Sequence, residues 1–307
     1  MVYLPEGKLI LTAQNKVALS SLNNLKLAME NKTILEAKAV VCDSEHNLIV
    51  DLGEIKGIIL KNEGAVGIAE GTTRDIALIS RVNKPVCFVV ENFKQNENGE
   101  TVAILSRRKA QIMCNENFIK KLKCGDVIDA VVTHMEPFGC FVDIGCGIAS
   151  LVPIDTISIS RISHPSDRFY IGQNIKAVVK SHDGDFRLSL THKELLGTWE
   201  ENARNFHAGE TVVGVVRSVE KYGIFIELAP NLAGLAELKE GVFVGQQVSV
   251  YIKSLIPEKM KIKLIIVNSF EGEFNKNSYE YPKSTSHINY WRYSPLSCEK
   301  VIESNFE

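Results

Sequence analysis

One stretch of sequence occurs twice in this chain, and this repeat limits the possible folds more than any other feature. The first copy begins with Gly125-Asp126-Val127 and continues with Phe138-Gly139-Cys140-Phe141-Val142-Asp143-Ile144-Gly145. The second copy begins with Gly209-Glu210-Thr211 and continues with Tyr222-Gly223-Ile224-Phe225-Ile226-Glu227-Leu228. Gly125 and Gly139 both recur 84 positions later, so the chain carries a repeated unit of domain size.

Each unit has the pattern of a small β-barrel. Short alternating apolar runs are separated by clusters of Gly, Asp, Asn and Pro, and helical periodicity is absent within the units. The middle unit predicts strands at 127–133, 141–144, 175–179 and 186–190, and the third at 212–216, 224–228, 248–252 and 259–264. The third unit lacks 11 residues of the connection that runs from Asp155 to Ile171 in the middle unit.

A fainter first unit lies upstream. Residues 46–53 align with residues 138–145 at an offset of 92, although the two aromatic residues are missing. Flanking strands can be drawn at 35–41, 85–90 and 102–106. We therefore expect three tandem barrels, of which the first has diverged.

Length and charge limit the classes of function. The 307 residues are ample for three domains of modest size, each with its own core. Because the formal net charge is −2, an anionic partner must meet a local basic face and not a basic protein as a whole. No apolar run approaches membrane-spanning length, and the start of the chain lacks a signal-peptide pattern. We expect a soluble, cytoplasmic protein without a membrane partner.

The sequence contains no recognisable catalytic or metal-binding motif. Seven cysteines are scattered without a Cys-x-x-Cys spacing, which disfavours a disulfide framework and a zinc site and favours buried reduced thiols. It contains no nucleophile–base–orienter set, no phosphate-binding glycine loop and no cluster of metal ligands. We expect no catalytic residue, no metal and no cofactor; an enzyme role, for example as a nuclease subunit, would need a catalytic domain that this chain lacks.

Paired aromatic residues around a glycine give the strongest functional signal. Phe138 and Phe141 would point to opposite faces of a regular strand, but a bulge at Gly139 would bring both onto one face. Phe141 then shares its side with Asp143, because positions 140, 142 and 144 form the apolar, inward set. Two rings on the outward face of a barrel form a stacking surface for unpaired bases.

The third unit repeats this arrangement with Tyr222 and Phe225 and adds lysines. Lys259, Lys261 and Lys263 alternate along the last expected strand, and we interpret them as phosphate contacts beside the rings. Two alternatives stay open: the rings could pack against a neighbouring domain or close a barrel mouth, and the lysines could be a solvated edge. Weaker basic groups, open between RNA contact and solvated surface, are Arg74, Arg81, Lys84, Arg107, Arg108 and Lys109.

The segment Gly125 to Leu190 resembles the RNA-binding domain repeated in the small-subunit ribosomal protein S-one, a five-stranded OB-fold. Besides the glycine and ring motifs, the resemblance rests on Ser163-His164-Pro165-Ser166, Gly172-Gln173 and Arg187-Leu188-Ser189-Leu190, in the family's order and spacing. The third unit is similar but shortened, and the first is recognisable mainly by its order. The whole chain is similar to the shorter S-one-like proteins of Gram-positive anaerobes.

The resemblance implies an all-β fold of three tandem five-stranded OB-fold barrels with short connecting helices. It also implies binding of single-stranded RNA, most typically mRNA at the small ribosomal subunit, without catalysis; the rival is a scaffold that docks on the ribosome or RNA polymerase. We expect a helical segment at 1–33, barrels at 34–110, 122–192 and 207–268, a linker helix at 193–206, and a tail at 269–307 with a short helix opened by Ser294-Pro295.

The family's RNA face, carried over to this chain, adds Arg161 and His164 of the long connection to the rings of the middle unit. The full set of expected RNA-binding residues is Phe138, Phe141, Arg161, His164, Arg187, Tyr222, Phe225, Lys259, Lys261 and Lys263. The chain departs from the family at Pro153 and Glu237, where a His is usual, and at Asp185, where a basic residue is usual. The first unit has His46 and Ile49 at the ring positions, so we expect it to stack bases most weakly.

Overall fold

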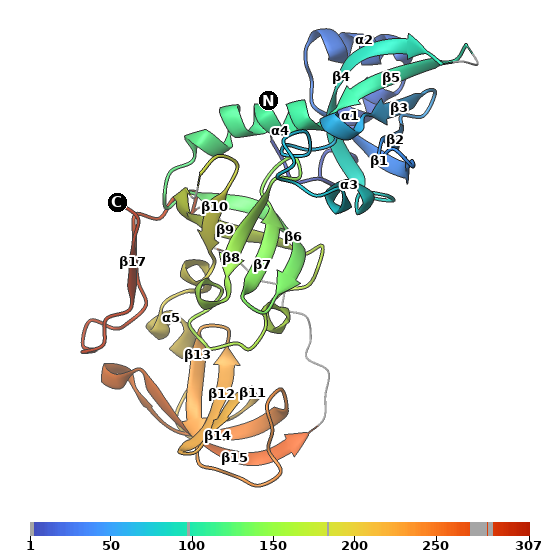
Figure 1. Cartoon of the computed structure of the whole chain (residues 1–307). Helices are drawn as coiled ribbons and strands as arrows, with labels where there is room; N and C mark the ends of the chain where they lie inside the picture. Colours follow the sequence, from blue (N-terminus) through green and yellow to red (C-terminus); the bar gives the residue numbers. More distant parts are fainter. Residues whose placement is uncertain (1–2, 97–98, 183, 271–280, 282–284) are drawn as a thin grey trace. The chain divides into compact units, whose positions relative to one another are not determined.

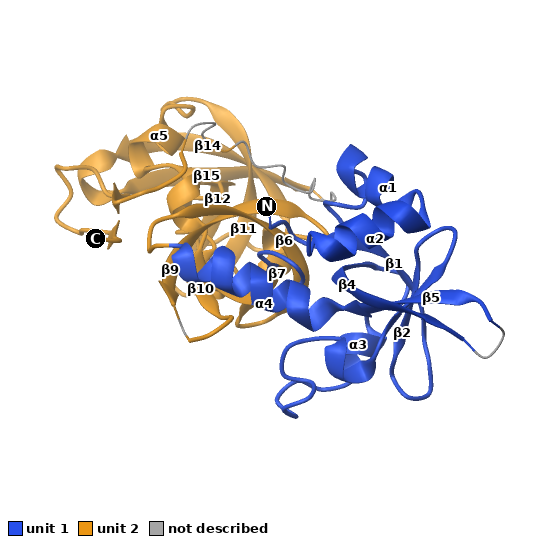
Figure 2. Ribbon diagram, turned by 90° about the horizontal axis from the view of Figure 1, so that it is seen from above, with its two compact units in different colours: residues 1–122, 143–149 blue, residues 123–142, 150–307 orange. Residues whose placement is uncertain are grey.

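The protein forms three closed barrels of five strands each, in sequence along the chain (Figure 1). This computed structural model describes residues 3–96, 99–182, 184–270, 281 and 285–307. The expected all-β fold is confirmed. Two compact units can be separated, residues 1–122 with 143–149 and residues 123–142 with 150–307 (Figure 2). The six segment bounds drawn from the sequence stay a prediction, and the polar start of the tail at 271–280 lies outside the described residues.

Two capped helices precede the first barrel. They are α1 (Ala13–Leu19) and α2 (Leu22–Glu30), whose first-turn N–H groups donate to the side chains of Thr12 and Ser21. The barrel has the order β1-β2-β3-β5-β4. Its strands are β1 (Leu35–Cys42), β2 (Leu48–Asp51), β3 (Lys56–Ile59), β4 (Pro85–Gln95) and β5 (Thr101–Ser106). The turn η1 (Lys61–Glu63) and the helix α3 (Ile76–Ile79) lie between β3 and β4, and α4 (Arg107–Asn117) and η2 (Ile119–Lys121) follow β5.

The core of the first barrel comes from alternation along its strands. Leu48 and Val50 of β2 are fully buried, whereas Ile49 between them is only half-buried, because successive side chains point to opposite faces of a strand. Leu25 and Ala28 of α2 pack into the same core. The helix therefore covers one side of the barrel by adding its own apolar stripe.

The middle barrel has the order β10-β8-β7-β6-β9. Its strands are β6 (Val127–Glu136), β7 (Gly139–Asp143), β8 (Ala149–Pro153), β9 (Asn174–His182) and β10 (Leu188–Thr191). Its long connection carries the turns η3 (Ile154–Thr156) and η4 (Pro165–Asp167). The expected linker helix is shorter than 193–206, because it consists of η5 (Lys193–Leu196) and the helix α5 (Trp199–Ala203), which begins at a capping box of Thr198 and Glu201.

The third barrel has the order β11-β12-β13-β15-β14. Its elements are β11 (Thr211–Glu220), β12 (Gly223–Ala229), β13 (Leu232–Ala236), β14 (Gln247–Ile256), η6 (Pro257–Lys259) and β15 (Lys261–Phe270). The tail adds β16 (Tyr290–Arg292) and β17 (Glu303–Asn305), and Trp291 and Tyr293 join the third core. The helix expected at Ser294-Pro295 is absent from the described tail, because the Ser294 hydroxyl accepts from Ile302 N–H instead of capping a helix.

In the third barrel the ring pair is positioned by a tight hairpin and not by a bulge at the glycine. In the third barrel Glu220 pairs with Gly223, so Lys221 and Tyr222 form a two-residue turn, and the register shift lies upstream in β11 between Val216 and Ser218. The bulge expected at Gly139 of the middle barrel stays a prediction. The glycine is still required: a Cβ at Gly223 would lie 2.6 Å from the Ala236 carbonyl oxygen, and one at Gly139 would lie 2.5 Å from that of Val152.

Candidate nucleic-acid interface

The two ring pairs have the same geometry in the middle and third barrels. Phe138 and Phe141 have ring centroids 6.1 Å apart and planes at 88°, and Tyr222 and Phe225 give the same two values. Phe138 is 55 % exposed and Tyr222 is 70 % exposed. The alternation expected for β7 and β12 is confirmed, because residues 140, 142, 224 and 226 are fully buried. An edge-to-face pair with an exposed first ring presents open ring faces to a ligand.

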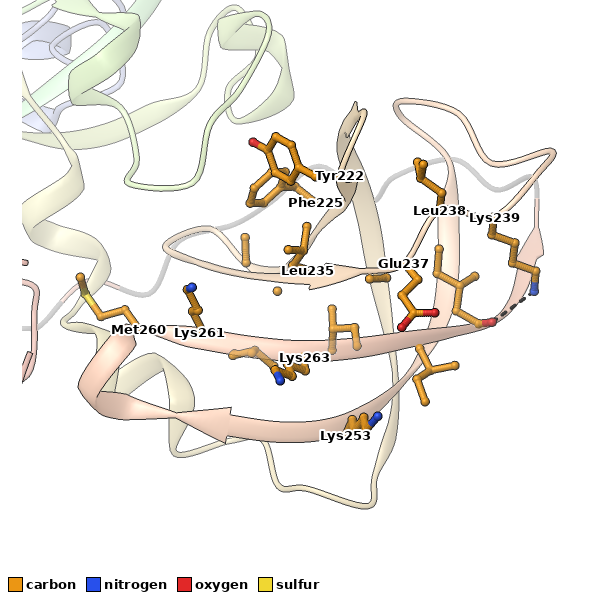
Figure 3. Close-up of a pocket in the computed structure, with 17 residues that line it drawn as sticks. Tyr222, Phe225, Leu235, Glu237, Leu238, Lys239, Lys253, Met260, Lys261 and Lys263 are labelled. Carbon is orange, nitrogen blue, oxygen red and sulfur yellow. Dashed lines mark hydrogen bonds between the residues drawn. The ribbon is translucent and has the colours of Figure 1, made fainter.

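The ring pair of the third barrel borders a groove with a volume of about 900 Å³ (Figure 3). Lys261 and Lys263 extend outward from β15, with the buried Ile262 and Leu264 alternating inward. Lys253 comes from the neighbouring strand β14 and lines the same groove. Within the described part of the chain, these three lysines form no ion pair with Asp or Glu. The groove therefore combines a stacking surface with cations that are free to meet phosphate.

Lys259 does not belong to this strand. It lies in the turn η6, and Met260 after it has the left-handed backbone conformation, with φ of 47°, so β15 begins only at Lys261. Lys259 is exposed but does not line the groove. Lys253 takes its place, and the alternation of β14 was the signal that could have found it, since Tyr251 and Lys253 are exposed on either side of the buried Ile252.

The other expected contacts of the middle barrel lie outside its ring-bearing hairpin. Arg161 is exposed in the long connection, and Arg187 is exposed immediately before β10. His164 is half-buried and caps η4, because its Nδ1 accepts from the backbone N–H of Ser166 at 3.1 Å. Their contact with RNA stays a prediction.

The acidic residue after each ring pair is covered. Asp143 and Glu227 share the outward parity of Phe141 and Phe225, yet each is only 4 % exposed. Asp143 accepts from the backbone N–H groups of Glu6 at 2.8 Å, Gly145 at 2.8 Å and Gly147 at 3.1 Å. The outward face of β7 and β12 is therefore open to solvent at the rings but covered at Asp143 and Glu227.

Glu227 is buried because the long connection of the middle barrel packs on the third barrel within the second unit. Arg168 of that connection donates to Glu227 Oε2, and Arg217 Nε donates to the same oxygen at 2.9 Å. Arg217 also pairs with Asp167 at 3.1 Å. The Asn231 side chain accepts from Ile159 N–H at 2.8 Å. We call this set of contacts the barrel clasp.

The weaker basic groups are mostly paired with acids in the first unit. Arg107 is buried, and its Nε donates to Glu6 at 2.6 Å, while Arg81 reaches the same carboxylate at 3.2 Å. Burial alone would raise the pKa of Glu6, but the Arg107 guanidinium, with help from Arg81, lowers it below its ordinary value. Arg108 pairs with Glu70 at 2.8 Å, and Lys109 pairs with Glu91. The interpretation of Arg107 as a surface cation was wrong.

The first barrel replaces the rings with other side chains. His46, in the turn between β1 and β2, pairs with Asp75 at 3.0 Å, and Lys61 pairs with the same carboxylate at 2.7 Å. Ile49 lies opposite Ile58, which lies opposite Ile104, so an aliphatic row crosses β2, β3 and β5. The weak base stacking expected of this barrel stays a prediction.

Sequence reasoning missed one ring of the middle barrel. His134 of β6 stacks on Phe141 with centroids 6.2 Å apart and planes at 24°. Its Nε2 lies 2.7 Å from Glu136 Oε1. The equivalent position of the third barrel, Ser218, lies directly opposite Phe225, and this cross-strand register was the signal that could have found the ring.

The cysteines and the other metal-ligating side chains are the remaining candidates for a further site. All seven cysteines are free, and five of them are buried. In the described ranges, no group of three or more His, Cys, Asp or Glu is arranged to hold a metal ion. No described helix has the length and apolar character needed to span a membrane.

Comparison with known proteins adds the family. The profile described as S1 RNA binding domain matches residues 121–193, the middle barrel. The small ribosomal subunit protein bS1 of Staphylococcus aureus is 30% identical over 284 residues, covering 87% of this chain and 70% of that protein. The bS1 protein of Staphylococcus haemolyticus is 29% identical over 277 residues, covering 85% of this chain and 68% of its own.

One solved structure with a long match is described as a multidomain protein with nucleic acid binding domains from Streptococcus pneumoniae. It has 14% identity and a TM-score of 0.25, and the match covers 80% of this chain and 76% of that one. A score this low adds nothing to the fold, which rests on the three barrels themselves. The identity and coverage of the staphylococcal proteins decide the family: this chain belongs to the bS1 family of small ribosomal subunit proteins.

Proposed function

We propose that this protein binds single-stranded RNA through the ring pairs of its middle and third barrels, and that this RNA is mRNA at the small ribosomal subunit. It acts in the cytoplasm as a binding protein and catalyses no reaction. The S1 domain match and the bS1 relatives support RNA binding and association with the small subunit. We assign the RNA contacts to particular residues from the geometry of the barrels.

The observation that carries this assignment is the groove of the third barrel, where exposed rings and lysines without an acidic partner lie together (Figure 3). Each base stacked on an aromatic side chain contributes about 1–3 kcal/mol with little dependence on sequence. Each lysine that neutralises a phosphate releases a counterion, which makes binding salt-dependent. Stacking on unpaired bases requires that the RNA be single-stranded, because the bases of a duplex are already stacked on one another.

The test is the affinity of the full chain for a single-stranded oligoribonucleotide and for a duplex of the same length, at several salt concentrations. We expect the single strand to bind more tightly, with weak sequence selectivity and a negative salt slope. Equal affinity for the duplex would contradict base stacking. A protein-interaction scaffold on the ribosome or RNA polymerase, the rival function, would dock normally and show no affinity for RNA.

A further inference from the structure

We propose that His134 is a third base-stacking ring of the middle barrel, so that this barrel contacts one base more than its ring pair alone would. The inference rests on the proposed RNA-binding function. It adds to that function a residue and a difference between the two barrels that the shared ring motif does not contain.

The geometry places three aromatic rings in succession on the hairpin of β6 and β7. Phe138 meets Phe141 edge-to-face, and His134 lies beside Phe141 with planes only 24° apart. The His134 side chain is 59 % exposed, so it does not serve as a core residue. Phe141 itself is half-buried, so the exposed rings of His134 and Phe138 on either side of it are the faces on which consecutive bases of a single strand can stack.

A neighbouring acid holds the imidazole in place. Glu136 lies two residues further along the same strand, and its Oε1 is 2.7 Å from His134 Nε2. Successive odd or even residues of a strand share a face, so this bond fixes the ring over the outward face on which Phe141 lies. Even a charged pair at such an exposed position contributes only about 0–1 kcal/mol to stability, so folding alone gives a weak reason for this arrangement.

The middle and third barrels differ at two equivalent positions of their outward faces. The 84-residue offset aligns His134 with Ser218 and Glu136 with Glu220, so the third barrel keeps the acid but lacks the ring. At another position the difference is reversed. Lys263 lies beside Leu235 in the third barrel, whereas Ser189 lies beside Leu151 in the middle one. At these two positions the middle barrel therefore has one ring more and one cation fewer than the third, while Arg187 keeps a cation at the position of Lys261.

The experiment isolates the middle barrel by using the full chain with Tyr222→Ala and Phe225→Ala as the background. In that background we measure the dissociation constant for a single-stranded oligoribonucleotide at several salt concentrations. His134→Ala should weaken binding by about 5- to 150-fold, the range of one lost stack, with an unchanged salt slope. His134→Phe should retain the affinity, because it keeps a ring and removes the ionisable group.

A matched experiment adds the missing ring to the third barrel. Ser218→His in the otherwise unchanged chain places a ring opposite Phe225 and beside Glu220, and should tighten binding within the same range. Thermal melting of each variant verifies that it is folded. His134→Lys separates stacking from charge, because it supplies a cation without a ring, and should bind as weakly as His134→Ala.

Three outcomes overturn the inference. Full affinity of His134→Ala, in a protein that Phe138→Ala with Phe141→Ala weakens, would remove His134 from the interface and leave the proposed function intact. Retention by His134→Lys with loss by His134→Phe would identify a phosphate contact. Unaltered binding after loss of Phe138 and Phe141 would instead reject the part of the proposed function that assigns RNA binding to the middle barrel, because it shows that these rings are not an RNA surface.

Discussion

At the scale of single residues, the rings of the middle barrel show how a surface position can be read from alternation. The strand β7 buries residues 140 and 142, so Phe141 must point outward, and the preceding turn adds Phe138 to the same side. Rings that a packed fold leaves exposed are free to contribute their stacking energy to a ligand.

Replacing Phe138 and Phe141 together by Ala should weaken binding of single-stranded RNA by a few kcal/mol, at about 1–3 kcal/mol per lost stack. The salt slope should stay nearly constant, because neither ring meets phosphate as a cation. Titration of the folded double variant at several salt concentrations measures both quantities. If the affinity stays that of the parent, the stacking surface lies elsewhere.

A second residue couples the fold of the middle barrel to pH. His192 is fully buried, and its Nδ1–H donates to the Ile157 carbonyl oxygen at 3.1 Å, so Nε2 accepts from the Tyr281 hydroxyl at 2.9 Å. Burial, opposed by the Ile157 bond and aided by Arg168, lowers the pKa of His192 to about 4. The unfolded chain takes up this proton near its ordinary pKa of about 6.5.

Because the folded-state pKa is depressed, the contribution of His192 to stability is fully present above pH 6.5 and is lost as pH falls toward 4. Between pH 7 and pH 5 this should remove roughly 2 kcal/mol. Urea unfolding of the parent and of His192→Gln at both pH values tests this, since the comparison cancels the other titrating groups. A parent and variant with the same pH dependence would contradict the neutral state of the buried ring.

The sequence predicted the exposure of a side chain correctly where alternation along one strand determines it. It failed where a contact with a distant part of the chain determines it. Phe141 and Phe225 could be placed because their neighbours in the strand are apolar. The burial of Glu227 could not, since its partner Arg168 is 59 residues away in the sequence and meets it only in the fold. His134 was missed because its place beside Phe141 follows from the register across the hairpin, which requires the turn to be placed first.

At the scale of elements, the lysine strand of the third barrel is the clearest difference between the barrels. Lys261 and Lys263 leave β15 on its outward face, and Lys253 joins them from β14. The expected strand began two residues too early, because the left-handed conformation of Met260 ends the turn η6 and cannot be read from a Lys-Met-Lys pattern. The repeat predicted the barrels, whereas strand ends depended on local turns.

Replacing Lys253, Lys261 and Lys263 by Gln should flatten the log–log salt dependence of RNA binding by roughly two units, at about 0.7 per phosphate neutralised on a single strand. Lys259→Gln is the matched control, because this lysine is exposed on the same barrel but lies outside the groove. Its slope should equal that of the parent. Equal slopes for the triple variant and the control would show that the strand is only a solvated edge.

At the scale of the molecule, the barrel clasp joins two copies of one repeat. The Arg168 and Glu227 side chains are 0% and 4% exposed, and Arg217 shares the same carboxylate. The 11 residues that the third repeat lacks belong to the connection that carries this clasp in the middle repeat. The longer connection of the middle repeat therefore holds the two barrels together. The family resemblance had suggested only an RNA-binding role for it.

Glu227→Ala should destabilise the protein by about 3–5 kcal/mol, because it leaves the fully buried Arg168 without its anion, while Arg217 keeps only Asp167. Glu240→Ala removes an exposed acid from the same barrel and should change stability by less than about 0.5 kcal/mol. Denaturant unfolding of both variants measures the difference. A cost below about 1 kcal/mol for Glu227→Ala would mean that the clasp contributes little to the fold.

The clasp also has a consequence for how long RNA stays bound. Two barrels held together offer the second site at a high effective concentration once the first has bound a strand, so release of one barrel is followed by rapid rebinding. Because the contacts that hold the two barrels form when the protein folds, no flexible linker has to be ordered at the moment of binding. A strand that engages both ring pairs should therefore leave slowly, while one that reaches a single pair exchanges freely.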